Sequence, residues 1–181
     1  MPLTFLVGGA RSGKSTLAVQ MGEHNGGPVH FIATAEAFDD DLRERIERHR
    51  AERPAGWSTA EVPLELADGI ADAPAGSVVI VDCLTVWLGN LFVHASAHSE
   101  RSAAADALVA ALRERAVHAT APTVVVSNEV GMGIHPETTM GREYRDELGR
   151  LNQAVAAAAD RTLLLVAGRA LRLDNPWELL R

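Results

Sequence analysis

The sequence has 181 residues, a formal net charge of −7 and 47% hydrophobic residues. A chain of this length suits one α/β domain that buries roughly 70% of the surface of its unfolded form, so the fold needs no disulfide or structural metal. The acidic balance argues against a surface that wraps nucleic acid. We therefore expect a single domain over residues 1–181 and no nucleic-acid partner.

Cys83 is the only cysteine, so no intrachain disulfide can form. The sequence also starts without a signal peptide, and both features favour a reducing, cytoplasmic setting. The longest apolar runs, residues 77–81 and 162–167, have the length of strands and are bounded by polar residues or glycine. We therefore expect a cytoplasmic protein without a transmembrane segment.

Short apolar segments alternate with helical segments along the chain. We expect strands at residues 3–7, 29–33, 77–82, 123–127 and 162–166, and helices at about 15–23, 40–52, 64–72, 101–119 and 139–159. Each strand is rich in aliphatic residues, as are parallel strands that are buried on both faces. The alternation predicts an α/β fold: a doubly wound, mainly parallel sheet with helices on both faces.

The most informative motif directly follows the first strand and has the spacing G-x-x-x-x-G-K-S. It consists of Gly8, Gly9, Ala10, Arg11, Ser12, Gly13, Lys14 and Ser15. In a phosphate-binding loop (P-loop), the backbone N–H groups surround nucleotide phosphates, the lysine reaches the β- and γ-oxygens, and the serine hydroxyl ligates Mg²⁺. An ordinary glycine-rich turn is the alternative. The flanking strand and helix favour nucleotide binding by all eight residues.

Ligands of doubly wound sheets bind outside the carboxyl ends of the strands. Thr34, Ala35 and Glu36 follow the second strand, and we expect them to bind nucleotide. Asp82 ends the third strand after four aliphatic residues, as the Mg²⁺-associated carboxylate of P-loop proteins does. With Ser15 it predicts a Mg²⁺ site, although a helix cap or turn aspartate would occupy the same place.

Two further segments carry candidates. After the fourth strand, Glu129 and the run Gly131-Met132-Gly133 predict a turn whose backbone approaches a ligand, although a flexible corner would use the same residues. Residues 39–54 have an acidic start and a basic end, as a solvated amphipathic helix has. That interpretation does not explain why Arg45 and His49 share one face. Arg50 and Arg53 follow near the helix end, so several cationic donors converge with one imidazole. A lone histidine is nevertheless more often structural than catalytic.

Six blocks succeed one another along nearly the whole chain, at residues 8–15, 32–35, 45–61, 81–85, 127–134 and 145–153. The P-loop is generic, whereas Arg-Ile-x-x-His-Arg at 45–50 and Ser-Asn-Glu-Val-Gly-Met-Gly-Ile at 127–134 are specific. In content and order the blocks resemble the bifunctional adenosylcobinamide kinase/adenosylcobinamide-phosphate guanylyltransferase family of cobalamin biosynthesis. The resemblance implies a RecA-like P-loop NTPase fold and a homotrimer.

It also implies two reactions. ATP or GTP phosphorylates the aminopropanol hydroxyl of adenosylcobinamide, and a histidine then attacks the α-phosphorus of GTP and passes GMP to adenosylcobinamide phosphate. By resemblance the nucleophile is His49, and Arg50, Ala51, Glu52, Arg53 and Glu61 bind nucleotide, while Lys14 is catalytic and Ser15 and Asp82 hold Mg²⁺. A neutral imidazole is available near pH 7, and a covalent intermediate divides one difficult transfer into two easier ones.

Two other classes of function remain open at this point. One is a P-loop enzyme without a covalent intermediate, either a small-molecule kinase or a RecA-like ATPase. The other is a module that senses GTP without turnover. Neither requires His49 and its neighbouring arginines, so the sequence favours the bifunctional transferase.

Overall fold

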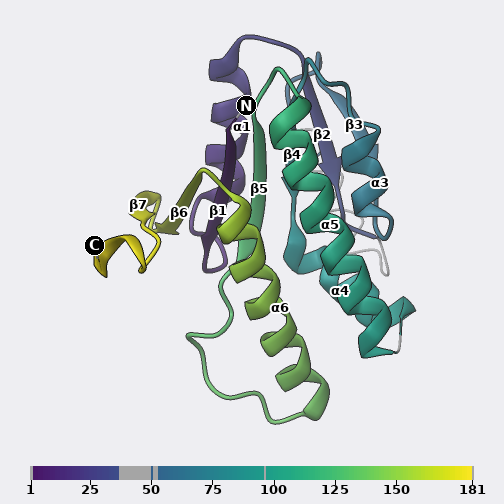
Figure 1. Ribbon diagram of the computed structural model, residues 1–181, viewed down its shortest axis with the longest axis vertical. Helices are drawn as coiled ribbons and strands as arrows, with labels where there is room; N and C mark the ends of the chain where they lie inside the picture. Colours follow the sequence, from purple (N-terminus) through teal and green to yellow (C-terminus); the bar gives the residue numbers. More distant parts are fainter. Residues whose placement is uncertain (1, 37–49, 51–52, 96, 181) are drawn as a thin grey trace.

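The computed structural model describes residues 2–36, 50, 53–95 and 97–180 (Figure 1). The strands are β1 (Leu3–Gly8), β2 (Val29–Ala33), β3 (Ser58–Glu61), β4 (Val78–Asp82), β5 (Thr123–Asn128), β6 (Arg161–Val166) and β7 (Arg169–Leu173). The helices are α1 (Lys14–Asn25), α3 (Leu66–Ala71), α4 (Leu84–His94), α5 (His98–His118) and α6 (Thr139–Ala158), followed by a short 3₁₀ helix, Glu178–Leu180.

The seven strands form one sheet in the order β3-β2-β4-β5-β1-β6-β7. Neighbouring strands are parallel, apart from the antiparallel pair β6–β7 at one edge. The prediction of a mainly parallel, doubly wound sheet is therefore confirmed. The order places β5 between β1 and β4, so the segment after β5 lies between the P-loop and Asp82 at the carboxyl edge.

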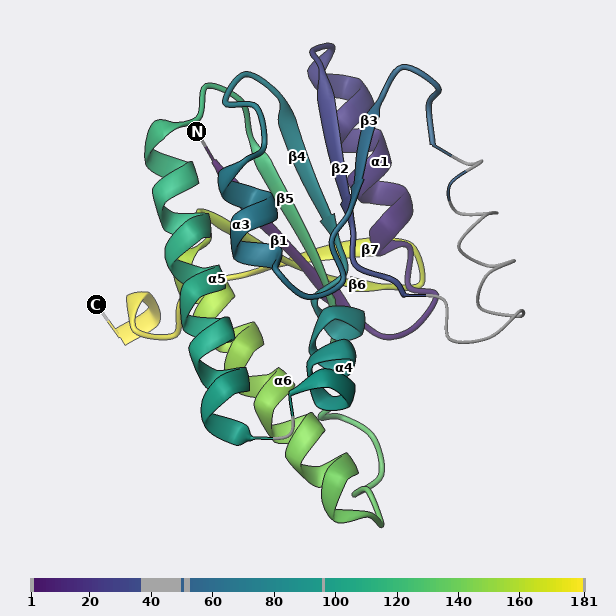
Figure 2. The ribbon, with the colours of Figure 1, turned by 90° about the vertical axis from the view of Figure 1, so that its right-hand side faces the viewer.

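Of the helices that the structure describes, α1 covers one face of the sheet and α3, α4, α5 and α6 cover the other; Figure 2 shows α1 and α5 on opposite sides. Ala18 of α1 packs with Leu6, Ile80 and Val126. The other face buries residues such as Trp87 of α4. Alternating side chains of the same strands supply both cores, because successive residues point to opposite faces.

Three elements differ from the expectation. Helix α4 begins directly after the strand that ends at Asp82, and its nearly continuous apolar sequence has little of the periodicity that marks a helix. β3 and β7 are short edge strands with mostly exposed residues, so burial left no pattern in their sequences. His94 ends α4, and His98 begins α5. The helix expected at 40–52 lies mostly outside the described residues.

A buried ion pair joins α5 to α6. Arg101 donates from Nε and Nη2 to the two carboxylate oxygens of Glu147 over 2.9 and 2.8 Å, and the ring of His98 lies 2.7 Å from Oε1. Burial favours the neutral acid, but the hydrogen bonds from Arg101 and His98 prevail and hold the pKa of Glu147 below its usual value. The pair thus fixes how the two longest helices pack.

No helix among the described residues is long and apolar enough to cross a membrane.

Candidate nucleotide-binding site

The P-loop connects β1 to α1 and is held from both sides. Gly8 packs so closely on the backbone carbonyl of Leu165 in β6 that a Cβ would not fit. Its own carbonyl accepts a hydrogen bond from the Glu129 N–H over 3.1 Å. On the other side, the Gly168 N–H donates to the Ser12 carbonyl over 3.0 Å. The loop conformation is therefore fixed by the segments that follow β5 and β6.

Lys14 begins α1 and is the only lysine in the sequence. Its side chain is buried, and Nζ donates to the Gly9 carbonyl over 2.7 Å and to the Ser12 hydroxyl over 3.3 Å. Burial lowers the pKa of the amine, an effect opposed by Cys83 and Asp82. The ammonium group thus lies inside the loop, where the phosphates of a nucleotide bind in P-loop proteins.

A cavity of about 340 Å³ opens beside the P-loop. It is lined by residues of α1, by Phe31 of β2 and by two charged residues from elsewhere: Ser15, Thr16, Val19, Gln20, Glu23, Phe31, Arg53 and Asp82. Ser15 and Asp82 therefore reach one space from the first turn of α1 and the end of β4. A hydroxyl and a carboxylate suit Mg²⁺, which takes oxygen ligands and completes its shell with water and phosphate.

Arg53 brings a positive charge to this cavity. Its guanidinium stacks on the ring of Phe31, with Cζ 3.9 Å from the ring centroid. Burial lowers the pKa of Arg53, and the negative charge of Asp82 opposes that shift. Arg50 instead forms an exposed ion pair with Glu61, with 3.2 Å between Nη1 and Oε1. The structure thus brings Arg53 together with Ser15 and Asp82, and pairs Arg50 with Glu61 nearby.

The Thr34 side chain is hydrogen-bonded to the backbone of the residue that follows Asp82. It is fully buried, and its hydroxyl donates to the Cys83 carbonyl over 2.8 Å and accepts from the Cys83 N–H over 2.9 Å. These bonds fix the segment that carries Asp82. The carboxylate of Glu36 instead contacts the end of α4, where its Oε2 lies 3.0 Å from Nε2 of His94. Nucleotide contacts by Thr34, Ala35 and Glu36 stay predictions.

Sequence reasoning missed a network at the end of β5. The Thr85 hydroxyl accepts from the Asn128 N–H over 2.7 Å, and Asn152 Nδ2 donates to the Asn128 carbonyl over 3.0 Å. The Ser127 hydroxyl donates to Asn152 Oδ1 over 2.7 Å. All four residues belong to the blocks that suggested the family, but spacing gave no indication of their contacts.

Four residues singled out in the sequence, Arg45, His49, Ala51 and Glu52, lie outside the described residues, so their roles stay predictions.

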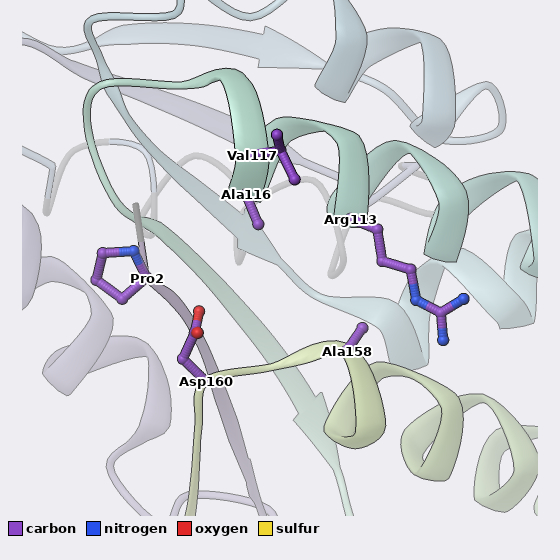
Figure 3. Close-up of a pocket in the computed structure, with 6 residues that line it drawn as sticks. All are labelled: Pro2, Arg113, Ala116, Val117, Ala158 and Asp160. Atoms are coloured by element: carbon purple, nitrogen blue, oxygen red, sulfur yellow. The ribbon is translucent and has the colours of Figure 1, made fainter.

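A second hollow, of about 580 Å³, lies at the opposite end of the sheet. Figure 3 shows Arg113 and Asp160 on separate sides of it. An Asp160 carboxylate oxygen already accepts the Leu3 N–H over 2.7 Å. The charged groups of this hollow, Arg113 and Asp160, therefore do not converge, whereas Arg53 and Asp82 both line the P-loop cavity.

The sheet order and the P-loop define a RecA-like P-loop NTPase. Two solved structures share this fold. The flagellar accessory protein FlaH from Methanocaldococcus jannaschii matches with a TM-score of 0.53 and 13% identity, over 96% of this chain and 78% of that one. The RadB recombinase matches with a TM-score of 0.55 and 17% identity, over 90% and 73%.

Sequence similarity then identifies the family. Residues 4–173 match the profile of the cobinamide kinase/cobinamide phosphate guanyltransferase family. A bifunctional adenosylcobalamin biosynthesis protein, CobP from Pseudomonas aeruginosa, is 41% identical over 94% of this chain and 96% of its own length. The protein of the same description from Escherichia coli, CobU, is 36% identical over 94% and 99%. The chain belongs to this family and is a bifunctional kinase and guanylyltransferase of cobalamin biosynthesis.

Proposed function

We propose that the enzyme phosphorylates the aminopropanol hydroxyl of adenosylcobinamide with ATP or GTP and then transfers GMP from GTP to the phosphorylated product. The second transfer passes through guanylylated His49 and yields adenosylcobinamide-GDP. The observation that carries the proposal is that Ser15, Arg53 and Asp82 line one cavity beside the P-loop in which Lys14 is buried, in a chain of this family.

In the kinase step, the substrate hydroxyl oxygen attacks the γ-phosphorus. The bond from the γ-phosphorus to the β–γ bridging oxygen breaks, the nucleoside diphosphate leaves and the hydroxyl proton is released. Lys14 and the N–H groups at the start of α1 stabilise the negative charge on the phosphoryl oxygens. Ser15 and Asp82 would hold Mg²⁺, which when bound neutralises phosphate charge.

In the guanylyl step, an imidazole nitrogen of His49 attacks the α-phosphorus of GTP and pyrophosphate leaves. A phosphate oxygen of adenosylcobinamide phosphate then attacks the same phosphorus, the P–N bond breaks and the neutral imidazole is regenerated. Arg53, already at the cavity, and Arg50, next to His49 in sequence, supply positive charge to this transfer. We extend the proposal to a homotrimer, which rests on the family resemblance and is tested by light scattering.

The two reactions are separated by product analysis. Purified protein is incubated with adenosylcobinamide and ATP or GTP, and the products are followed by mass spectrometry. The parent is expected to form adenosylcobinamide phosphate with a triphosphate and adenosylcobinamide-GDP only with GTP. His49→Ala should form the phosphate and no GDP derivative. A parent that makes neither product, or a His49→Ala variant that makes both, overturns the proposal.

A further inference from the structure

The connection between β5 and α6 carries residues to which the proposed mechanism gives no role. It consists of residues 129–138 and includes most of the specific block at 127–134. Figures 1 and 2 show it extending beyond the carboxyl ends of the strands, on the side of the P-loop. Its first residue, Glu129, donates its backbone N–H to the Gly8 carbonyl at the start of the P-loop. The connection therefore begins at the nucleotide-binding edge of the sheet and extends away from it.

This connection and the first turn of α6 leave large apolar side chains open to solvent. The exposed fractions of Met132 and Ile134 are 81% and 97%, and that of Met140, at the start of α6, is 64%. Single exposed apolar residues are ordinary on a protein surface, but several in one short segment beside a binding site indicate a ligand that covers them. Covering them is favourable because it removes apolar surface from water.

Hydrogen bonds hold the connection against α6. Arg145 Nη1 lies 3.2 Å from Nδ1 of the His135 ring. Arg142 Nη1 donates to the carbonyls of Pro136 and Glu137 over 3.1 and 2.7 Å. The apolar side chains are thus carried by a backbone that is tied down at both ends. Such preorganisation reduces the entropy that is lost when a ligand binds.

The charge of this segment differs from that of the P-loop. Residues 129–146 carry four carboxylates against two guanidinium groups. Lys14 and Arg53, by contrast, bring positive charge to the P-loop and its cavity, as an anionic triphosphate requires. Adenosylcobinamide has the opposite character, because its cobalt(III) corrin ring carries a net positive charge and is rich in methyl groups. Charge and polarity therefore match the phosphoryl donor to the P-loop and the corrinoid to residues 129–146.

We propose that Met132, Ile134 and Met140 form a binding surface for the corrin ring of the acceptor substrate, whose aminopropanol arm extends to the P-loop. The inference rests on the proposed function and deepens it by placing the larger of the two substrates. The hydrogen bond between Glu129 and Gly8 joins this corrin surface to the loop that holds the phosphates. The same surface serves both transfers, because both acceptors carry the same ring.

The test measures the affinities for acceptor and donor separately. Equilibrium dialysis with adenosylcobinamide, followed by its visible absorbance, gives the corrinoid affinity, and a parallel titration gives the affinity for β,γ-imido GTP. Met132→Gln and Ile134→Asn each remove one covered apolar side chain and should weaken corrinoid binding by roughly tenfold, with nucleotide affinity within about twofold of the parent. Ile134→Leu keeps the apolar surface and should bind the corrinoid within about twofold of the parent.

Val117→Asn is the matched control, because Val117 is an exposed aliphatic residue at the opposite end of the sheet. It should leave both affinities unchanged. Thermal unfolding without ligands should be unaltered in all variants, because the replaced side chains are exposed. Should Ile134→Asn impair folding, Met132→Gln carries the test.

Three results overturn the inference. The first is unchanged corrinoid affinity in the folded Met132→Gln and Ile134→Asn proteins. The second is an equal loss of corrinoid and nucleotide affinity. The third is a change of oligomeric state in light scattering, since a second copy of the chain would then cover the surface.

Failure of the proposed function has a separate signature. A parent that binds adenosylcobinamide, with the affinity reduced in Met132→Gln and Ile134→Asn, but makes no adenosylcobinamide phosphate, contradicts the proposed function and supports the corrin surface. A parent that makes both products while the two variants keep its corrinoid affinity contradicts the corrin surface alone.

Discussion

Replacing Lys14 with methionine should remove activity without removing the fold. The ammonium group makes two hydrogen bonds, to Gly9 and Ser12, each contributing about 1 kcal/mol to the free energy of unfolding. The stabilisation by these hydrogen bonds is opposed by the cost of burying the charged ammonium group, and the same burial lowers the pKa of Lys14. The two effects oppose each other, so Lys14→Met should lower the free energy of unfolding by less than about 2 kcal/mol, or roughly 4–8 °C in Tm.

The functional cost should be much larger. Loss of a charge that stabilises the transferred group in a dry site costs about 3 kcal/mol, more than a hundredfold in rate. Nucleotide binding supplies a second readout. At a GTP concentration of 100 times the parent Kd, binding stabilises the parent by about 2.7 kcal/mol, whereas a variant with hundredfold weaker binding gains only about 0.4 kcal/mol.

The assay combines turnover of adenosylcobinamide with thermal unfolding at several GTP concentrations. Arg113→Met, the same loss of a cation at the opposite end of the sheet, is the matched control and should behave as the parent does. Near-parental turnover by a folded Lys14→Met protein would refute the reasoning. So would a large fall in Tm without nucleotide, because the lysine would then be needed for folding.

Two further perturbations test the metal site and the helix packing. Asp82→Asn keeps the side-chain shape but removes a charge, so its turnover should need about tenfold more Mg²⁺; superimposable Mg²⁺ titrations of variant and parent would show that Asp82 does not hold the ion. Glu147→Gln leaves Arg101 buried without its counter-charge and should lower the free energy of unfolding at pH 7 by about 3 kcal/mol. Because the folded pKa of Glu147 is depressed, its stabilisation is full above the unfolded carboxyl pKa and is lost as the pH falls through the lower, folded pKa. Parent and variant should therefore converge in acid unfolding, and a constant difference would contradict the assignment.

The sequence was most informative where the signal is local. The P-loop and Asp82 could be predicted because a contiguous motif, and an acid after four aliphatic residues, each specify their own turn. The parallel, doubly wound arrangement of the sheet followed from alternation of strand and helix, whereas the edge strands β3 and β7 have too little burial to leave a pattern. The fold was therefore predictable in its centre and not at its edges.

The remaining contacts are non-local. Asn152 reaches Asn128 from a position 24 residues along the chain, and the spacing of the two residues carries no trace of that bond. Arg115 would be expected as a surface cation near the end of a helix, yet its guanidinium is buried and donates to the carbonyls of Ala73, Pro74 and Ser77. Such partners are specified by how α5 and α6 pack on the sheet, not by any periodicity within them.

Labelling with GTP that carries radioactive phosphorus at the α-position tests the guanylylated-histidine mechanism most directly. The parent should acquire a covalent label that is labile in acid and stable in alkali, located by peptide mapping at His49. His49→Ala should acquire no label while still phosphorylating adenosylcobinamide. A His49→Ala protein labelled at the parental rate would contradict the mechanism and place the nucleophile at another residue.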